Sequence, residues 1–323
     1  MPLAEMLLIA GALSAPAFFL IFALASLGSP LLAMLCLAVS QLRSTQYIEA
    51  YARRLLRMAL TAALPALLAF AVATALAARK APWMVDWVHS APLGPGLFVV
   101  SALAFFASLL TLRQSRPAAR HGRQSSPLTQ AFILSLLAII ILCLSLALTI
   151  GLMEQAQAVL QAPTAGGISV APLIPPDASA LPPFIWAALA ALVPLCIACA
   201  SVMSQEYILM LRDRDPFGRE ALAQMLRIAS RSTLRSTLLA MAFLPMIWLH
   251  LAKISAQPGV HSSAQLLLVV AGACSIALCF CAGMVTRSSR PWANSLAIHL
   301  EFLALWMGLT ALLSIVLFNF YAA

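Results

Sequence analysis

One carboxylate, Glu301, stands well inside a long apolar run near the end of this chain, and polar neighbours accompany it at helical spacing. On a helix, residues seven positions apart share a face, whereas residues two apart do not. Asn294 is therefore predicted to share a face with Glu301, and His299 to point elsewhere. A carboxylate in an apolar segment is costly enough that its default interpretation is functional. The hypothesis is a proton path; the alternative is a structural hydrogen bond to a neighbouring helix.

The composition indicates that these residues sit in a membrane. Hydrophobic residues make up 63% of the 323 positions and charged residues only 9%, whereas soluble domains carry about 25% charged residues. Apolar runs of about 18 residues or more can span a bilayer core. By that criterion we expect an all-α protein with eight spans, near 10–38, 58–78, 95–112, 129–152, 183–204, 236–252, 264–286 and 292–320.

The basic residues gather on one side of the predicted membrane. Most lie between odd and even spans, and the other side holds only Arg79, Lys80 and Lys253. The positive-inside rule then places those loops in the cytoplasm and both termini outside, in an inner (cytoplasmic) membrane. The net charge of +9 is a topology signal and does not indicate a nucleic-acid partner. The expected anchors at the cytoplasmic interface are Arg113, Arg116, Arg287 and Arg290.

Internal matches predict a duplicated chain. The pentapeptide RQSRP at 113–117 returns as RSSRP at 287–291, and a Ser-Gln pair follows ten residues after both Pro30 and Pro194. The alternative is that Arg and Pro simply mark helix ends at the interface. Because each unit would have an even number of helices, the two repeats would be parallel. The predicted divisions are a first four-helix unit at 1–155, an extracytoplasmic Pro/Gly-rich loop at 156–182 and a second four-helix unit at 183–323.

A basic amphipathic stretch follows the first helix of each unit. The two stretches are STQYIEAYARRLLR at 44–57 and LRDRDPFGREALAQMLRIASR at 211–231. Their apolar residues recur at helical spacing against charged ones, which predicts helices that anchor at the cytoplasmic membrane surface and continue the neighbouring helices. The alternative is a docking face for a cytoplasmic partner.

The chain offers little for a metal or heme. Cys196 and Cys199 share a helix face but have no partner pair, so small apolar packing is favoured over a metal or redox site. No C-x-x-C-H motif is present, which excludes covalently attached c-type heme. For a b-type heme, His299 lacks an assigned second donor, and Met246 would crowd the same side of the iron as His250. We expect no metal and no heme on this chain.

Taken together, the tandem units, the outward N-terminus and the amphipathic connectors resemble the membrane subunits of cytochrome bd-type quinol oxidases. The stretches that carry the resemblance are LLAMLCLAVSQLRSTQYIEAYARRLLR at 31–57, SLLTLRQSRP at 108–117 and YILMLRDRDPFGREALAQMLRIAS at 207–230. The resemblance covers most of the chain and rests on pattern and spacing.

Departures from that family narrow what the resemblance implies. Its catalytic subunit binds hemes through His in the first and fifth helices, Met in the seventh and carboxylates in the third and beyond. Here the first and fifth spans have no His, the third has no Asp or Glu, and the seventh has only Met284. The ninth helix typical of the family is also missing. The resemblance therefore implies a heme-free member, like the second subunit or a degenerate first subunit.

We accordingly expect a non-catalytic membrane subunit of a respiratory, quinone-linked electron-transfer complex. Its partners would be other membrane subunits, which would hold the hemes, and lipids; this chain would hold at most a bound quinone or lipid. Glu301, His299 and Asn294 would then form a proton path or contact a quinone head group. One alternative is a heme-free quinol-binding anchor of a periplasmic oxidoreductase. An alternative of another class is a small-solute transporter, which also uses tandem repeats and midplane polar residues.

Overall fold

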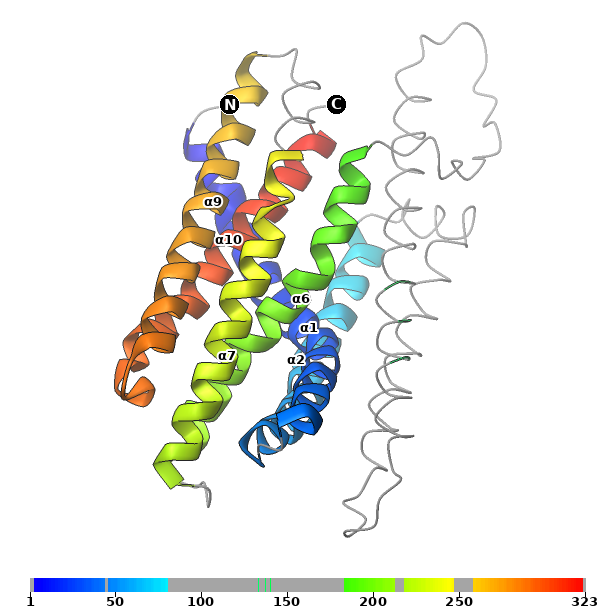
Figure 1. Cartoon of the computed structure of the whole chain (residues 1–323). Helices are drawn as coiled ribbons and strands as arrows, with labels where there is room; N and C mark the ends of the chain where they lie inside the picture. Colours follow the sequence, from blue (N-terminus) through cyan, green and yellow to red (C-terminus); the bar gives the residue numbers. More distant parts are fainter. Residues whose placement is uncertain are drawn as a thin grey trace, which may run out of the picture.

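A computed structural model describes residues 3–43, 46–80, 183–212, 218–246 and 258–321, together with single helical residues at 133, 137 and 140. All regular structure in these residues is helical (Figure 1). The helices are α1 (Leu3–Arg43), α2 (Gln46–Lys80), α6 (Pro183–Leu211), α7 (Gly218–Met241), α9 (Pro258–Arg287), the 3-10 helix η2 (Pro291–Asn294) and α10 (Ser295–Tyr321).

Four helices are long and apolar enough to cross a membrane, which indicates a multi-pass membrane protein. They coincide with the predicted spans 10–38, 183–204, 264–286 and 292–320, and α2 covers the predicted span 58–78. The predicted spans 95–112 and 129–152, apart from the three single residues, and the loop 156–182 lie outside the described residues. The four candidate spans are Gly11–Val39, Ala190–Leu211, Gln265–Arg287 and Pro291–Ile315.

The two amphipathic stretches begin longer helices, as the prediction of helix continuation expected, and parts of their apolar faces are buried inside the protein. The first is the beginning of α2, where Tyr51 and Leu55 are fully buried in a core that includes Met225 of α7. The second becomes the first half of α7, with Leu226 fully buried in the same core. Each apolar face is therefore covered by neighbouring helices of the protein instead of by lipid. An amphipathic pattern reports one buried face but does not say what buries it.

The predicted span 236–252 also has the wrong bounds. The helix that contains its first residues begins at Gly218 and ends at Met241, and a turn at 242–243 leads to one short helical turn at 244–246. Buried Ser and Thr residues and the exposed Arg231 and Arg235 interrupt the apolar pattern of α7. The hydropathy of 236–252 alone therefore misses most of this helix.

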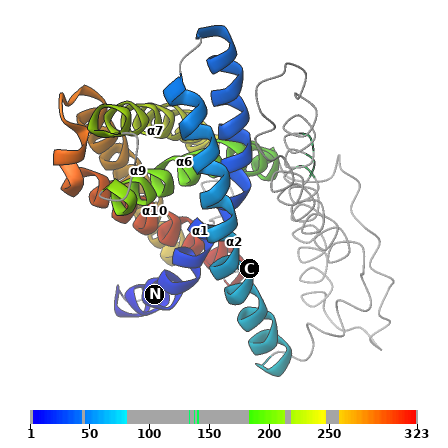
Figure 2. The same ribbon diagram turned by 90° about the horizontal axis from the view of Figure 1, so that it is seen from below.

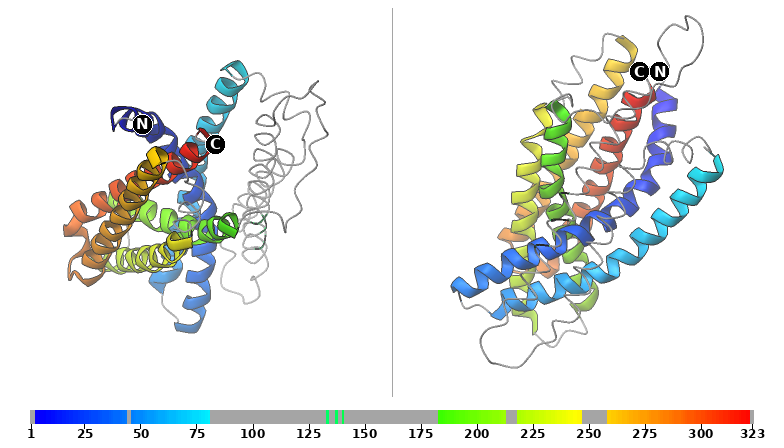
Figure 3. Two further views of the ribbon diagram at one scale, coloured as in Figure 1. Left: turned by 90° about the horizontal axis from the view of Figure 1, so that it is seen from above. Right: turned by 90° about the vertical axis from the view of Figure 1, so that its right-hand side faces the viewer.

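Helices α6, α7, α9 and α10 stand side by side, with successive helices packed against each other (Figures 1 and 3). Helix α1 crosses them at an angle and packs on both α6 and α10, and α2 runs along α1 (Figures 2 and 3). The last residues of α1, α6 and α9 lie at the end of the bundle opposite the two termini (Figure 1).

The crossing of α1 over α6 requires a glycine. A Cβ atom on Gly28 would lie 2.1 Å from the carbonyl oxygen of Cys196, far inside van der Waals contact. Small residues at helix contacts let backbones approach closely in membrane proteins. Around this contact, Cys196 and Cys199 are fully buried in an apolar cluster with Ile21 and Leu24, so the favoured packing role of the two cysteines is confirmed. Gly28 thus fixes the distance between α1 and α6.

We predict that Gly28→Ala lowers the free energy of unfolding by about 1–3 kcal/mol, the usual range for overpacking. The matched control is Gly11→Ala on the same helix, because a Cβ atom there would meet nothing within 4 Å. Unfolding in mixed micelles, followed by circular dichroism, gives both values. Equal effects of the two substitutions would contradict the close contact.

Candidate functional site

Three consecutive residues near the end of α6 reach three different surroundings. Ser204 lies 2.8 Å from the hydroxyl of Tyr51 on α2, and Gln205 is fully buried between α7 and α10. Glu206 turns to the other side of α10 and pairs with His299. Because successive residues on a helix are about 100° apart, adjacent side chains serve different neighbours. One turn of α6 therefore connects to α2, α7 and α10.

Glu301 accepts a hydrogen bond from the Gln205 amide inside this contact. The Gln205 Nε2 to Glu301 Oε2 distance is 2.7 Å, and both side chains are fully buried. Ser230 donates to Gln205 Oε1 at 2.8 Å, and Gln205 Nε2 also lies 3.3 Å from Thr233 Oγ1. Among the described residues, Glu301 Oε1 has no hydrogen-bond partner. One oxygen of the carboxylate is thus hydrogen-bonded to Gln205, and the other has no hydrogen-bond partner among the described residues.

The groups around the Gln205 amide can hold Glu301 in either protonation state. Hydroxyls both donate and accept, and the orientation of a Gln amide follows from its network. In the arrangement above the amide donates to an ionised Glu301, while Ser230 donates to the amide oxygen. After a half turn of the amide, its oxygen would accept from protonated Glu301. Ser230 would then accept an N–H and donate to the Leu226 carbonyl, 2.9 Å from its Oγ. Such a site suits a carboxyl group that gains and loses a proton.

A second titratable pair borders the buried one. His299 Nδ1 lies 2.9 Å from Glu206 Oε1, with the His299 side chain 60% exposed and the Glu206 side chain 15% exposed. Glu301 is fully buried, so the prediction that His299 and Glu301 occupy different faces is confirmed. The buried and exposed pairs use neighbouring positions on both α6 and α10. They form two parallel polar bridges between these helices.

Asn294 takes no part in these hydrogen bonds. It is the half-buried last residue of η2, and no hydrogen bond joins it to Glu301 in the described part of the chain. The spacing argument treated the segment as one α-helix, but a 3-10 helix has about 3 residues per turn instead of 3.6. The shared face predicted for Asn294 and Glu301 therefore does not extend with regular geometry across the junction.

The predicted interface anchors are described only in the second unit. Arg287 ends α9 and Arg290 precedes η2, and both side chains are exposed at the turn between these helices. This turn lies at the same end of the bundle as the last residues of α1 and α6 (Figure 1). Arg113 and Arg116 lie outside the described residues.

The turn that carries the second pentapeptide is fixed by another arginine. Arg227 Nη2 on α7 donates to the carbonyl oxygens of Ser288 and Ser289, each at 3.1 Å. Pro291 begins η2 and is buried. The pentapeptide therefore forms a compact connection between α9 and α10, held against α7.

Sequence reasoning missed Gln205 and the hydroxyl residues that surround it. The Ser-Gln pair after Pro194 served only as a repeat match, although a polar pair in an apolar helix already indicates a buried contact. On α7, Ser230, Thr233 and Thr237 follow the i, i+3, i+7 pattern of one helix face, and all three are buried. That spacing is visible in the sequence, but the charged residues around it favoured the prediction of a surface helix.

Comparisons with known proteins add no further guide to the function. A scan against protein-family models, a search of curated proteins and a search of solved structures each found no match. Among the described residues, no group of three or more His, Cys, Asp or Glu side chains could hold a metal ion. The function must therefore be inferred from the geometry around Glu301.

We predict strong energetic coupling between Gln205 and Glu301. Gln205→Leu should cost about 1–3 kcal/mol of unfolding free energy, because it leaves a buried carboxylate without its donor. In a Glu301→Leu background the same substitution should cost clearly less. The control cycle uses the exposed pair Glu49 and Arg53 on α2, where coupling should be about 0.3–0.5 kcal/mol. Additive effects at Gln205 and Glu301 would contradict the buried hydrogen bond.

Proposed function

We propose that this chain is a non-catalytic membrane subunit of a respiratory, quinone-linked electron-transfer complex, and that Glu301 carries protons for that complex. The observation that supports it is the buried Glu301 carboxylate, held at 2.7 Å by Gln205 with its second oxygen unpartnered among the described residues. A polar network that only stabilised the bundle would be expected to satisfy both oxygens. The resemblance to cytochrome bd-type membrane subunits supplies the respiratory context.

The proposed membrane arrangement has eight spans in two tandem parallel units, with both termini outside the cytoplasm. The common end at which α1, α6 and α9 finish supports one side for the connections that follow these three helices (Figure 1). Exposed Arg287 and Arg290 at that end support its assignment to the cytoplasm. The exposed His299–Glu206 pair then borders Glu301 on the cytoplasmic half of α10, where a proton can enter from the interface.

Catalysis belongs to partner subunits in this proposal. The spans that would hold heme ligands in a bd-type catalytic subunit lack His here, so the hemes belong to other chains. Beyond lipids, the partners are membrane subunits of the same complex, and a quinone is the one further small molecule expected near this chain. Glu301 therefore acts on proton delivery and not on electron transfer within this chain.

The test is Glu301→Gln in the native complex. This substitution keeps the side-chain shape and removes the exchangeable proton, so quinol-dependent turnover should fall at least tenfold. The matched control is Glu49→Gln, the same chemical change at an exposed position on α2. Turnover that stays normal in the Glu301 variant, with the complex intact, would remove the proposed role.

Heme content gives a separate check on the assignment of roles. The isolated chain should have no b-type alpha band in a reduced-minus-oxidised spectrum, and His299→Ala should leave the heme content of the complex unchanged. The physical reason is that a low-spin b-type heme needs two axial donors, and His299 has no assigned second donor on this chain. A b-type band from the isolated chain would overturn the heme-free assignment.

A further inference from the structure

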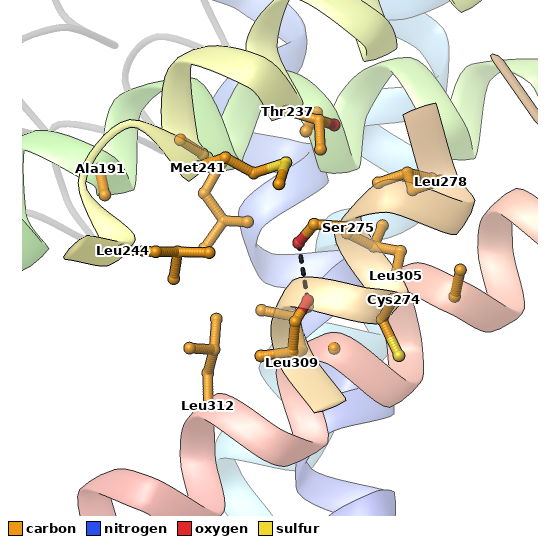
Figure 4. A pocket seen from close by; sticks show the side chains of 16 residues that line it. Ala191, Thr237, Met241, Leu244, Cys274, Ser275, Leu278, Leu305, Leu309 and Leu312 are labelled. Carbon is orange, nitrogen blue, oxygen red and sulfur yellow. Dashed lines mark hydrogen bonds between the residues drawn. The ribbon is translucent and has the colours of Figure 1, made fainter. Parts of the chain in front are cut away.

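A cavity of about 80 Å³ lies between α6, α7, α9 and α10 (Figure 4). Its walls are mostly apolar, with Leu244, Leu309 and Leu312 toward one side and two hydroxyl side chains, Thr237 and Ser275, on the others. Ser275 already donates to the Ala271 carbonyl at 2.8 Å. The Thr237 side chain is 4% exposed, and its hydroxyl has no partner among the described residues. Thr237 is thus the lining residue whose hydroxyl has no hydrogen-bond partner among the described residues.

The cavity lies directly beyond the Gln205–Glu301 cluster on each of three helices. On α7, Thr237 follows Thr233 by one turn, about 6 Å along the axis. On α10, Leu305 follows Glu301 by one turn and lines the cavity. On α6, Ala198 lines the cavity two turns from Gln205. Three helices therefore place the cavity one to two turns from the Gln205–Glu301 cluster.

Three unpartnered oxygen atoms belong to residues at the cavity wall, at the carboxylate and on the stretch of α6 between Ala198 and Gln205. Ser201 Oγ lies one turn from Gln205 on α6, and neither it, Thr237 Oγ1 nor Glu301 Oε1 has a hydrogen-bond partner among the described residues. All three residues are buried. Buried polar atoms of this kind are normally satisfied by ordered water, and a buried water needs two to four polar partners. α6, α7 and α10 each supply one such atom.

We propose that water bound by Thr237, Ser201 and Glu301 forms a proton lane from the cavity to the buried carboxylate. The apolar walls keep the wide part of the cavity free of fixed polar contacts, and the hydroxyls hold water at the end nearest Glu301. For each proton that reaches Glu301 from the cavity, its carboxylate oxygen forms an O–H bond with a proton from the adjacent water. That water regains a proton from its neighbour toward the cavity, so charge and atoms balance along the lane. The proposal rests on the proposed function only for the use made of the proton.

The experiment measures hydrogen–deuterium exchange at the Glu301 carboxyl in the full purified chain, reconstituted in lipid nanodiscs. The carbonyl stretch of protonated Glu301 is recorded by infrared spectroscopy at acidic pH and identified by its loss in Glu301→Gln. After transfer to D₂O, the wild-type band should shift within seconds. Thr237→Val keeps the side-chain shape without the hydroxyl and should slow this exchange at least tenfold.

Two further variants make the result specific. Thr237→Ser restores the hydroxyl and should restore the exchange rate. Thr310→Val removes a hydroxyl on α10 that donates to the Trp306 carbonyl at 2.9 Å and lies outside the cavity, so it should leave the rate unchanged. Circular dichroism confirms that each variant remains folded. Exchange in Thr237→Val at the wild-type rate, or wild-type exchange that takes hours, would overturn the lane and indicate a dry cavity.

The outcome is separable from that of the proposed function. Slowed exchange in Thr237→Val together with normal turnover of the Glu301→Gln complex would support the lane and reject the respiratory role. Unchanged exchange together with lost turnover would reject the lane alone.

Discussion

The hydrogen bond from the Gln205 amide to the Glu301 carboxylate constrains how the second half of the bundle can pack. Both groups are fully buried and 2.7 Å apart, so any rotation of α6 or α10 that separates them leaves a carboxylate without a donor. Leaving such a group unpaired costs more than the hydrogen bond gains, because the surroundings have a low dielectric constant. Ser230 and Thr233 extend the same constraint to α7. The register of three helices therefore follows from one amide.

The same turn of α6 also determines where the first two helices lie. The Ser204 hydroxyl donates to the Ser201 carbonyl at 2.7 Å, which leaves the Tyr51 hydroxyl of α2 as the donor in their contact. Two turns nearer the start of α6, the Cys196 carbonyl admits α1 only because residue 28 is glycine. Specific polar contacts and a close backbone approach thus hold helices whose apolar surfaces alone would pack in many ways. This specificity gives the buried carboxyl group a defined environment.

The all-helical class and four of the spans could be predicted because hydropathy directly reports contact with an apolar medium. Glu301 could also be predicted as the unusual residue, since a single carboxylate in an apolar run can be recognised from the sequence alone. Its partner could not, because Gln205 lies 96 positions away and nothing local distinguishes it from Gln41 in the matching Ser-Gln pair. The neighbours that bury the apolar faces of the amphipathic stretches could not be predicted for a related reason. Periodicity identifies a buried face, but protein and lipid cover such a face equally well.

The central claim is that this chain works as one subunit of a quinone-linked respiratory complex. Copurification from native membranes, with the chain tagged at its natural expression level and solubilised in a mild detergent, tests it most directly. The account predicts that the chain copurifies in fixed stoichiometry with a heme-containing membrane subunit, and that the preparation oxidises or reduces a quinone. Purification of the chain alone, or with partners that carry no redox group, would contradict it.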